Sequence, residues 1–209
     1  AVRFGQRPAI VFEGRTLTWS ELNEEANRYA QYFKGQGLER GDTVSLIMEN
    51  RVEFLALLIG LNKLGVTIGL INTNLNGRPL AHCVNVTNSK KCIFGAEVAA
   101  RMEEVKAELS LSEGEDYYVV ADGDNAPSLN WAIDLGSASD DASRDNPPDT
   151  VETTIGETAF YIFTSGTTGL PKAAVLSNRR YLISADMAAI AGFKATEQDR
   201  LYILSLIHI

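Results

Sequence analysis

Hydrophobic residues recur along this chain with two different periods, and the two periods alternate from the N-terminus onward. Two short apolar runs that flank a turn at Gly14 predict a β-hairpin. Thr18 and Glu21 then have the spacing of a capping box, and behind them apolar residues recur every three or four positions, which predicts a helix with one buried face. Gly35 and Gly37 are expected to end this helix, because glycine accepts the left-handed conformation that helix C-termini need.

The alternation continues through most of the chain. Short apolar runs predict further strands at residues 44–48, 66–71, 92–94, 117–121 and 159–163. Helical patterns occupy residues 51–64, 79–86, 98–109 and 178–193, with proline opening the second of them. Strands that alternate with helices of this length indicate a mainly parallel sheet with helices packed on its faces. The predicted fold class is therefore α/β, a layered and mainly parallel sheet with flanking helices.

The composition changes between residues 122 and 154. This stretch is rich in Asp, Ser and Pro, which predicts a long surface connection, and Trp131 is expected to touch the core from it. The sequence therefore divides into an N-terminal α/β portion at 1–121, a surface connection at 122–154 and a final portion at 155–209.

Composition and charge exclude several classes of protein. Hydrophobic residues make up 45% of the chain and charged residues 22%, which is typical of globular proteins and not of disordered ones. A net charge of −8 disfavours nucleic acid as a partner. Cys83 and Cys92 fit a reducing compartment. Together with His82 they lack the spacing and the fourth ligand of a zinc site, so all three are interpreted as buried core residues. The most apolar stretch, 54–71, is interrupted by polar residues and is interpreted as a helix and a strand, not as a membrane span.

One segment, residues 161–175, concentrates the candidate chemistry. It reads YIFTSGTTGLPKAAV, and its positions 164–172 combine four Ser or Thr hydroxyl groups, two glycines and a lysine directly after a hydrophobic strand. Glycines let the backbone approach a ligand closely, and hydroxyl groups supply short-range hydrogen bonds. Lys172 supplies a compact positive charge suited to phosphate oxygens, and Pro171 stiffens the exit of the loop. These properties predict a cradle for a polyphosphate.

Other interpretations fit this segment less well. A Walker A loop requires Gly-Lys-Ser/Thr in sequence, whereas Leu170 and Pro171 separate Gly169 from Lys172. The segment does not contain the G-x-G-x-x-G pattern of dinucleotide-binding loops either. A surface turn rich in Ser, Thr and Gly that binds nothing is the plain alternative. Such a turn would rarely combine this residue order with a flanking strand and a terminal Pro-Lys, so we favour phosphate binding.

The loop resembles the phosphate loop of the adenylate-forming superfamily, which includes acyl-CoA synthetases, coumarate-CoA ligases and luciferases. Residues 164–172, TSGTTGLPK, match that motif at every position. The stretches 16–22, TLTWSEL, and 41–44, GDTV, are similar to the superfamily's N-terminal region. Within the superfamily, GLINTNL at 69–75 and PLAHC at 79–83 resemble the long- and very-long-chain acyl-CoA synthetases known as fatty acid transport proteins.

The resemblance implies a two-step, ATP-dependent ligation of a fatty acid to coenzyme A. The fatty carboxylate attacks the α-phosphate of ATP to give an acyl-adenylate and pyrophosphate, and the thiol of coenzyme A then displaces AMP. By motif position Lys172 is the catalytic candidate for charge stabilisation, and Thr164 is the candidate for helping to hold Mg²⁺. The residues implied to line the nucleotide cradle are Thr164, Ser165, Gly166, Thr167, Thr168, Gly169 and Lys172.

The resemblance covers only the first part of such an enzyme. An acidic adenine loop with a magnesium-binding glutamate, a ribose-binding aspartate, a hinge and a late lysine would lie beyond residue 209, so 155–209 corresponds to the truncated start of an ATP-binding portion. We expect the 209-residue chain alone to be inactive and poorly soluble, because an incomplete domain leaves strand edges and apolar patches uncovered. The ending LSLIHI at 204–209 also departs from the superfamily's Leu-Pro-Leu-Tyr-His. This departure favours a truncated or chimeric terminus. In the alternative interpretation the ending is native, and His208 is the histidine of the superfamily's motif.

Two alternative functions stay open. One is a non-catalytic nucleotide- or acyl-binding remnant that kept the loop, and the other is a related ligase that adenylates an aromatic or short-chain acid. The leading function implies fatty acid, ATP and coenzyme A as partners, without nucleic acid. The whole protein is expected to face the cytosol and to associate with a membrane through segments outside this chain, and no sequence pattern fixes an oligomeric state.

Overall fold

The computed structural model describes residues 3–123, 127–164 and 169–201 of the 209-residue chain. An antiparallel hairpin of β1 (Pro8–Phe12) and β2 (Arg15–Thr18) precedes the main body. At its turn Glu13 and Gly14 both have positive φ, at 47° and 78°, as tight two-residue hairpins require. The predicted hairpin is therefore confirmed.

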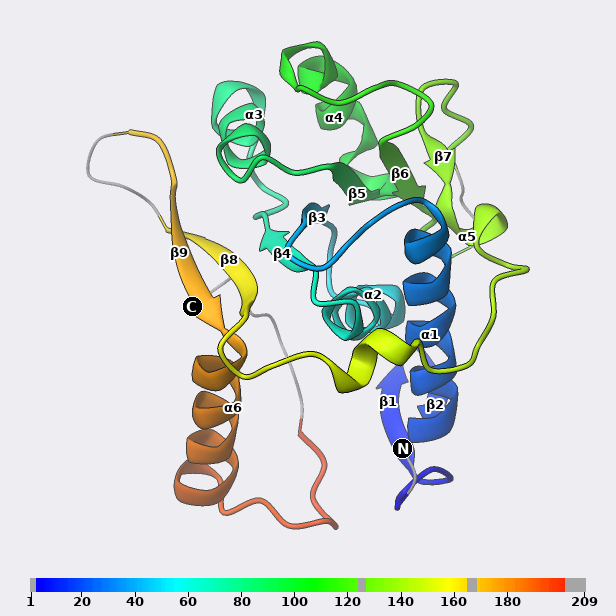
Figure 1. The fold of residues 1–209 in the computed structure, drawn as a ribbon, viewed down its shortest axis with the longest axis vertical. Coiled ribbons are helices and arrows are strands. Elements are labelled where there is room, and N and C mark those ends of the chain that lie inside the picture. Colours follow the sequence, from blue (N-terminus) through cyan, green and yellow to red (C-terminus); the bar gives the residue numbers. More distant parts are fainter. Residues whose placement is uncertain (1–2, 124–126, 165–168, 202–209) are drawn as a thin grey trace.

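The main body is a seven-stranded sheet in the order β7-β6-β5-β3-β4-β8-β9 (Figure 1). Its strands are β3 (Thr43–Ile47), β4 (Thr67–Leu70), β5 (Lys91–Gly95), β6 (Tyr117–Val120), β7 (Ile133–Asp134), β8 (Thr158–Thr164) and β9 (Lys172–Ser177). Neighbouring strands run parallel from β7 to β8, whereas β8 and β9 are antiparallel. The prediction of a mainly parallel α/β sheet is confirmed.

Helices cover both faces of this sheet (Figure 1). They are α1 (Trp19–Gly35) and α2 (Val52–Lys63) on one face, and α3 (Gly77–Val86) and α4 (Ala99–Val105) on the other. Successive strand residues point to opposite faces, so Ile93 packs with α1 and α2 whereas Cys92 and Phe94 pack under α3 and α4. Because both faces are buried, the strands read as nearly continuous apolar runs.

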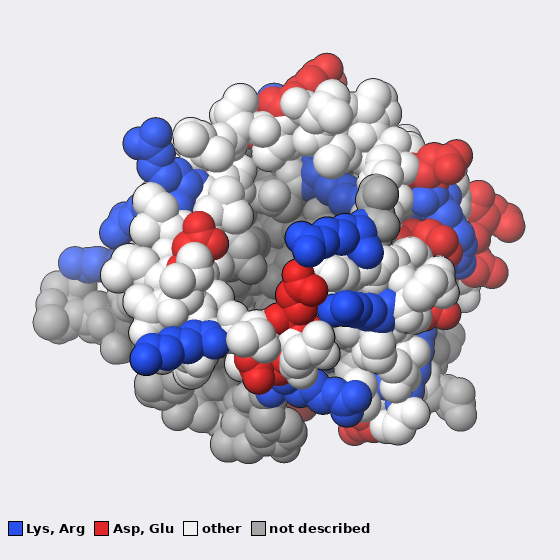
Figure 2. All heavy atoms as spheres, turned by 90° about the horizontal axis from the view of Figure 1, so that it is seen from below, with Lys and Arg blue, Asp and Glu red and all other residues white. Residues whose placement is uncertain are grey.

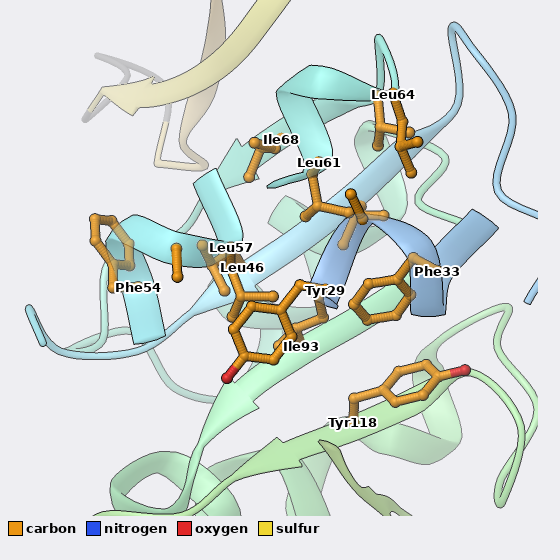
Figure 3. Packing of buried hydrophobic residues seen from close by; sticks show 14 of the residues in the cluster. Tyr29, Phe33, Leu46, Phe54, Leu57, Leu61, Leu64, Ile68, Ile93 and Tyr118 are labelled. Atoms are coloured by element: carbon orange, nitrogen blue, oxygen red, sulfur yellow. The ribbon is translucent and has the colours of Figure 1, made fainter. Parts of the chain in front are cut away.

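The larger core lies between the sheet and the α1–α2 pair, and Figure 3 shows it from close by. Tyr29 and Phe33 of α1 pack beside Leu57 and Leu61 of α2, and all four side chains are buried. The ring of Phe33 meets Tyr118 of β6 edge-on, with 5.0 Å between ring centroids. The predicted capping box holds the start of α1 in place, since Thr18 and Glu21 each accept a hydrogen bond from the other's backbone N–H.

Three helices differ from their prediction, and the one predicted at 178–193 consists of α6 (Asn178–Asp186) and a π-helix at Met187–Gly192. α3 begins at Gly77, two residues before Pro79, because the missing N–H of a proline in the first turn breaks no intrahelical hydrogen bond. The helix predicted at 98–109 consists of α4 with a 3₁₀ turn on each side, Ala96–Val98 and Lys106–Glu108. Its predicted apolar face is nevertheless buried, at Val98, Met102, Val105 and Leu109.

The connection at 122–154 contributes more to the fold than a surface loop would. Trp131 is buried as predicted, with its ring stacked on Phe94 at a centroid distance of 5.3 Å. The residues after it form β7, which pairs with β6 at the sheet edge, and then α5 (Leu135–Ala138). A 3₁₀ turn, Pro148–Val151, follows before β8. The division of the chain at residues 121 and 154 stays a prediction.

Polar contacts hold the second half of this connection against α1. Arg144 pairs with Glu25 at 2.5 Å, and its carbonyl accepts a hydrogen bond from Asn27 Nδ2 at 2.8 Å. Lys34 near the end of α1 pairs with Asp149 at 2.5 Å. The segment therefore crosses the surface, as its composition predicts, along a defined path.

The C-terminal end of the described chain exposes apolar side chains. After β9 come α6 (Asn178–Asp186), capped by Ser177, and a π-helix at Met187–Gly192. Val175 of β9 is 53% exposed and Ile190 of the π-helix is 71% exposed. Among the described residues, no helix combines the length and the hydrophobicity needed to span a bilayer.

Candidate phosphate-binding site

The predicted phosphate loop connects β8 to β9. Thr164, the last residue of β8, lies directly opposite Lys172, the first residue of β9, in the antiparallel register. The β8–β9 pair therefore brings the two ends of the TSGTTGLPK segment together. The segment leaves the sheet at the carboxyl end of a strand that runs parallel to β4, which is the edge where α/β sheets bind ligands.

The strand before the loop is anchored at its start and exposed at its end. Ala159 and Phe160 are buried, and Phe160 meets Tyr181 of α6 edge-on at 5.4 Å between ring centroids. Ile162 and Thr164 are exposed. The hydroxyl at the start of the loop is therefore accessible from solvent, while the base of the strand is fixed in the core.

Gly169 needs the conformational freedom of glycine. Its φ is +96°, in the region that other residues rarely adopt, and an added Cβ would have no neighbour within 4 Å among the described residues. The requirement is thus set by the backbone turn into β9 and not by lack of space. Of the other predicted cradle residues, Ser165, Gly166, Thr167 and Thr168 lie outside the described residues.

The donor set at the hairpin mouth fits an anionic ligand and one contact to a metal ion. The Lys172 side chain is exposed, and the Thr164 hydroxyl stands across the ladder from it. The described residues contain no group of three or more His, Cys, Asp or Glu side chains that could hold a metal on their own. Mg²⁺ usually takes only one or two protein oxygens and completes its shell with phosphate and water. A single threonine hydroxyl fits that arrangement.

His82 of α3 reaches the exit of the loop. Its Nε2 atom lies 3.1 Å from the carbonyl oxygen of Pro171, the residue before Lys172. From the sequence His82 was considered only as a zinc ligand or a core residue, and this contact of the half-buried side chain was not predicted. The segment PLAHC indicates only that His82 and the buried Cys83 leave the helix in different directions, and it carries no signal for the contact with Pro171.

The two cysteines are core residues, as predicted. Cys83 and Cys92 are both buried under α3 and α4. Burial raises the pKa of the Cys83 thiol to about 12 and also raises the pKa of Cys92. Both side chains are therefore uncharged thiols at neutral pH.

Other charges at the same edge of the sheet are already paired. Arg51, which follows β3, is buried and contacts Glu97 at 2.6 Å and Asp122 at 3.1 Å. These carboxylates follow β5 and β6, so the three side chains link the ends of neighbouring strands. The charge of Arg51 is balanced by protein groups, which makes this cluster a structural link and a poor anion site.

A hollow at the end of the molecule away from α3 is lined by charged side chains that are also paired with one another. Figure 2 looks onto this end, where positive and negative side chains are interspersed around the hollow. The residues that line it include Arg3, Phe4, Arg7 and Glu197. Glu197 pairs with both arginines, at 3.0 and 3.6 Å, and both guanidinium groups stack on the ring of Phe4. Lys172 therefore remains the better candidate for binding a polyphosphate.

Solved structures with the same arrangement define the class of fold. An anthranilate CoA ligase, AuaEII, in complex with anthranoyl-AMP aligns with a TM-score of 0.79 at 20% identity, over 90% of this chain and 35% of that one. A fatty acyl CoA synthetase of Mycobacterium tuberculosis aligns with a TM-score of 0.66 at 24% identity, over 93% of this chain and 36% of that one. The described fold is that of the N-terminal part of adenylate-forming enzymes.

The sequence comparisons then give the family. The family model of AMP-binding enzymes matches residues 1–209, so the chain belongs to the AMP-binding enzyme family. Long-chain fatty acid transport protein 6 of Homo sapiens is 33% identical over 210 residues, which cover all of this chain and 33% of that protein. The medium/long-chain-fatty-acid–CoA ligase FadD6 of Mycobacterium tuberculosis is 31% identical over 97% of this chain and 32% of that protein.

The predicted resemblance to fatty acid transport proteins and acyl-CoA ligases is therefore confirmed. The chain spans about a third of the length of these curated relatives.

Proposed function

We propose that this chain supplies the nucleotide-phosphate loop of an ATP-dependent fatty acid:CoA ligase. One observation carries the proposal. In a chain that matches the AMP-binding family from end to end, the TSGTTGLPK segment begins and ends on directly paired residues, Thr164 and Lys172, at the carboxyl edge of a parallel sheet. The similarity to long-chain fatty acid transport proteins supports a fatty acid as the acyl substrate.

In this proposal the loop binds the β- and γ-phosphates of ATP, which leave as pyrophosphate when a fatty carboxylate attacks the α-phosphate. Lys172 offsets the negative charge that develops on the leaving group, and backbone and hydroxyl donors of residues 164–169 hold it in line. Mg²⁺, held in part by the Thr164 hydroxyl, would neutralise further phosphate charge. The resulting acyl-adenylate then reacts with the thiol of coenzyme A to give the thioester and AMP. The loop positions the phosphates and stabilises the charge of the leaving pyrophosphate, and it contains no general base.

The proposal extends to the partners and the location of the whole protein. Fatty acid, ATP and coenzyme A are its substrates, and the protein works at the cytosolic side of a membrane. The relatives named as fatty acid transport proteins support the membrane association. Fractionation of cells that express the longest natural protein containing this sequence tests it, with recovery in the membrane fraction as the expected result.

Exchange of labelled pyrophosphate into ATP tests the reaction. The longest natural protein that contains this sequence should catalyse the exchange in the presence of long-chain fatty acids, and Lys172→Ala should lower kcat/KM for ATP about 100-fold. Lys90→Ala is the matched control, because Lys90 precedes β5 and thus lies at the amino edge of the sheet, opposite the loop. Its exposed pairing with Asp42 makes a small contribution to stability, so activity should be unchanged.

The choice of acid separates the proposal from its alternatives. If pyrophosphate exchange depends on benzoate or acetate and not on long-chain acids, the acyl substrate is an aromatic or short-chain acid and not a fatty acid. Tight binding of Mg-ATP without exchange under any acid would identify a nucleotide-binding remnant.

A further inference from the structure

We infer that His82 is a positioning residue for Lys172, acting through the carbonyl group of Pro171. This inference rests on the proposed function, since it concerns how the same phosphate loop is held. His82 would hold Pro171, the residue before Lys172, and would thereby orient the ammonium group of Lys172 towards the phosphates without contacting them itself.

The contact is specific in its chemistry. His82 Nε2 lies 3.1 Å from the Pro171 oxygen, and a carbonyl oxygen can only accept, so Nε2 must carry the hydrogen. Pro171 has no backbone N–H of its own, which leaves its carbonyl as the hydrogen-bonding group of that residue. The accepted bond orients the peptide plane between Pro171 and Lys172. That plane sets the direction in which the first residue of β9 leaves the loop.

The donor stands on a rigid support. The neighbours of His82 on α3, Ala81 and Cys83, are 3% and 0% exposed, so this helix turn is fixed in the core. α3 packs against β9 and follows β4, the strand that pairs with β8 (Figure 1). The paired Thr164 holds Lys172 from one side of the hairpin, and His82 holds the preceding residue from the helix layer. The exit of the loop is therefore tied to two separate elements.

A merely structural contact would behave differently from a positioning contact. A structural contact would change stability and the fraction of active protein, independently of Lys172. A positioning contact acts through Lys172, so its effect on catalysis must disappear when the lysine side chain is removed.

The test is a double-mutant cycle on kcat/KM for ATP in pyrophosphate exchange, in the longest natural protein that contains this sequence. His82→Leu, which keeps the bulk and removes the donor, should lower kcat/KM about threefold to tenfold. His82→Gln, which carries an N–H donor at similar reach, should restore most of the loss. In the Lys172→Ala background, His82→Leu should cause no further decrease. Val86→Ala is the control, because Val86 lies on the same helix and is 53% exposed.

Each contrary result overturns a defined claim. The positioning role is wrong if His82→Leu lowers kcat/KM by the same factor in the Lys172→Ala background as in the wild-type protein. It is also wrong if His82→Gln lowers kcat/KM as much as His82→Leu. If Lys172→Ala lowers exchange and His82→Leu does not, the positioning role is wrong and the proposed function stands. If Lys172→Ala itself leaves exchange unchanged, the proposed function is wrong. Melting temperatures of all variants show whether a loss of folding accounts for any decrease.

Discussion

At the scale of single residues, the charged side chains of this molecule fall into two kinds. Some are buried or half-buried in ion pairs, and others are exposed to solvent. Arg51 is buried because two carboxylates at the ends of neighbouring strands surround it. Glu25 of α1 is part of a similar arrangement, where Arg28 and Arg144 both contact it. In contrast, the Lys172 side chain is exposed at the mouth of the loop. The first two groups therefore contribute to the free energy of folding, whereas the third is the side chain proposed to bind the ligand.

The Glu25 carboxylate should make stability depend on pH in the acid range. Burial alone raises its pKa, but hydrogen bonds and charges of Arg144 and Arg28 outweigh this effect and hold the pKa below its ordinary value. A carboxyl group with a lowered folded-state pKa stabilises the protein above its unfolded-state pKa of about 4.3, and this contribution is lost as the pH falls through the folded value. Glu25→Gln should therefore flatten the decrease in melting temperature between about pH 5 and pH 3.

The neighbouring residue provides the control for this experiment. Glu24 is exposed on the same helix, so Glu24→Gln should leave the slope of melting temperature against pH unchanged. Equal slopes for the wild-type protein and Glu25→Gln would show that the ion pairs of Glu25 do not contribute to folding.

Gly169 tests the backbone of the loop exit. Alanine at this position must adopt the φ of +96° that the turn requires, although it would meet no neighbouring atom. We expect Gly169→Ala to lower the free energy of unfolding by about 1 kcal/mol, and to weaken nucleotide binding because the exit of the loop shifts. Chemical denaturation with parallel Mg-ATP titration measures both quantities. No change in either would show that the loop exit adopts another backbone conformation.

At the scale of elements, the close approach of α1 and α2 depends on one glycine. Gly60 of α2 faces the backbone of α1, and a methyl group there would collide with the carbonyl oxygen of Ala26 and lie 3.3 Å from the backbone nitrogen of Ala30. Neither backbone can yield without moving a helix. The pair of helices thus covers the sheet as a unit whose spacing is set by the missing side chain.

Gly60→Ala should therefore lower the free energy of unfolding by about 2 kcal/mol, the usual cost of overpacking. Gly35 is the matched control, because a Cβ there has no neighbour within 4 Å, so Gly35→Ala should be neutral or slightly stabilising. Thermal denaturation of the two variants measures the difference. Similar melting temperatures for both would contradict the close packing of α1 on α2.

Elements that depend on local sequence were predicted correctly, and those that depend on distant contacts were not. All strands except β7 and β9, and the capping box, followed from period and spacing, because each is a local property of a few residues. β9 (Lys172–Ser177) was interpreted only as the end of the loop motif and was not predicted as a strand. β7 was missed, since two residues carry no readable period and its pairing with β6 depends on Trp131 being drawn into the core. The loop ends were identified from the motif, but their register was not. The contact of His82 with Pro171 joins residues 89 positions apart, and no local pattern reports such a contact.

At the scale of the whole molecule, the C-terminal elements of the described chain carry a solvent-exposed apolar surface. β9, α6, the π-helix and the residue after it expose more than half of the surface of five apolar side chains, which are Val175, Ile183, Met187, Ile190 and Phe193. Exposed apolar surface on this scale drives association. The 209-residue chain on its own should therefore form oligomers or aggregates.

Sedimentation velocity of the isolated chain measures this behaviour. Replacing Ile183 and Ile190 by lysine should shift the distribution towards monomer, because both side chains are exposed and the change removes no core contact. The control is Val11→Lys, on the distant β1 hairpin, which should leave the distribution unchanged. A monodisperse, cooperatively melting wild-type chain would contradict the prediction.

The central claim is that the TSGTTGLPK loop binds the phosphates of ATP, and calorimetric titration with Mg-ATP tests it most directly. The protein used is the longest natural one that contains this sequence, in wild-type, Lys172→Ala and Lys90→Ala forms. The account predicts saturable binding to the wild-type protein and to Lys90→Ala, and binding at least tenfold weaker to Lys172→Ala. Equal affinity of all three forms would place the phosphates elsewhere and contradict the claim.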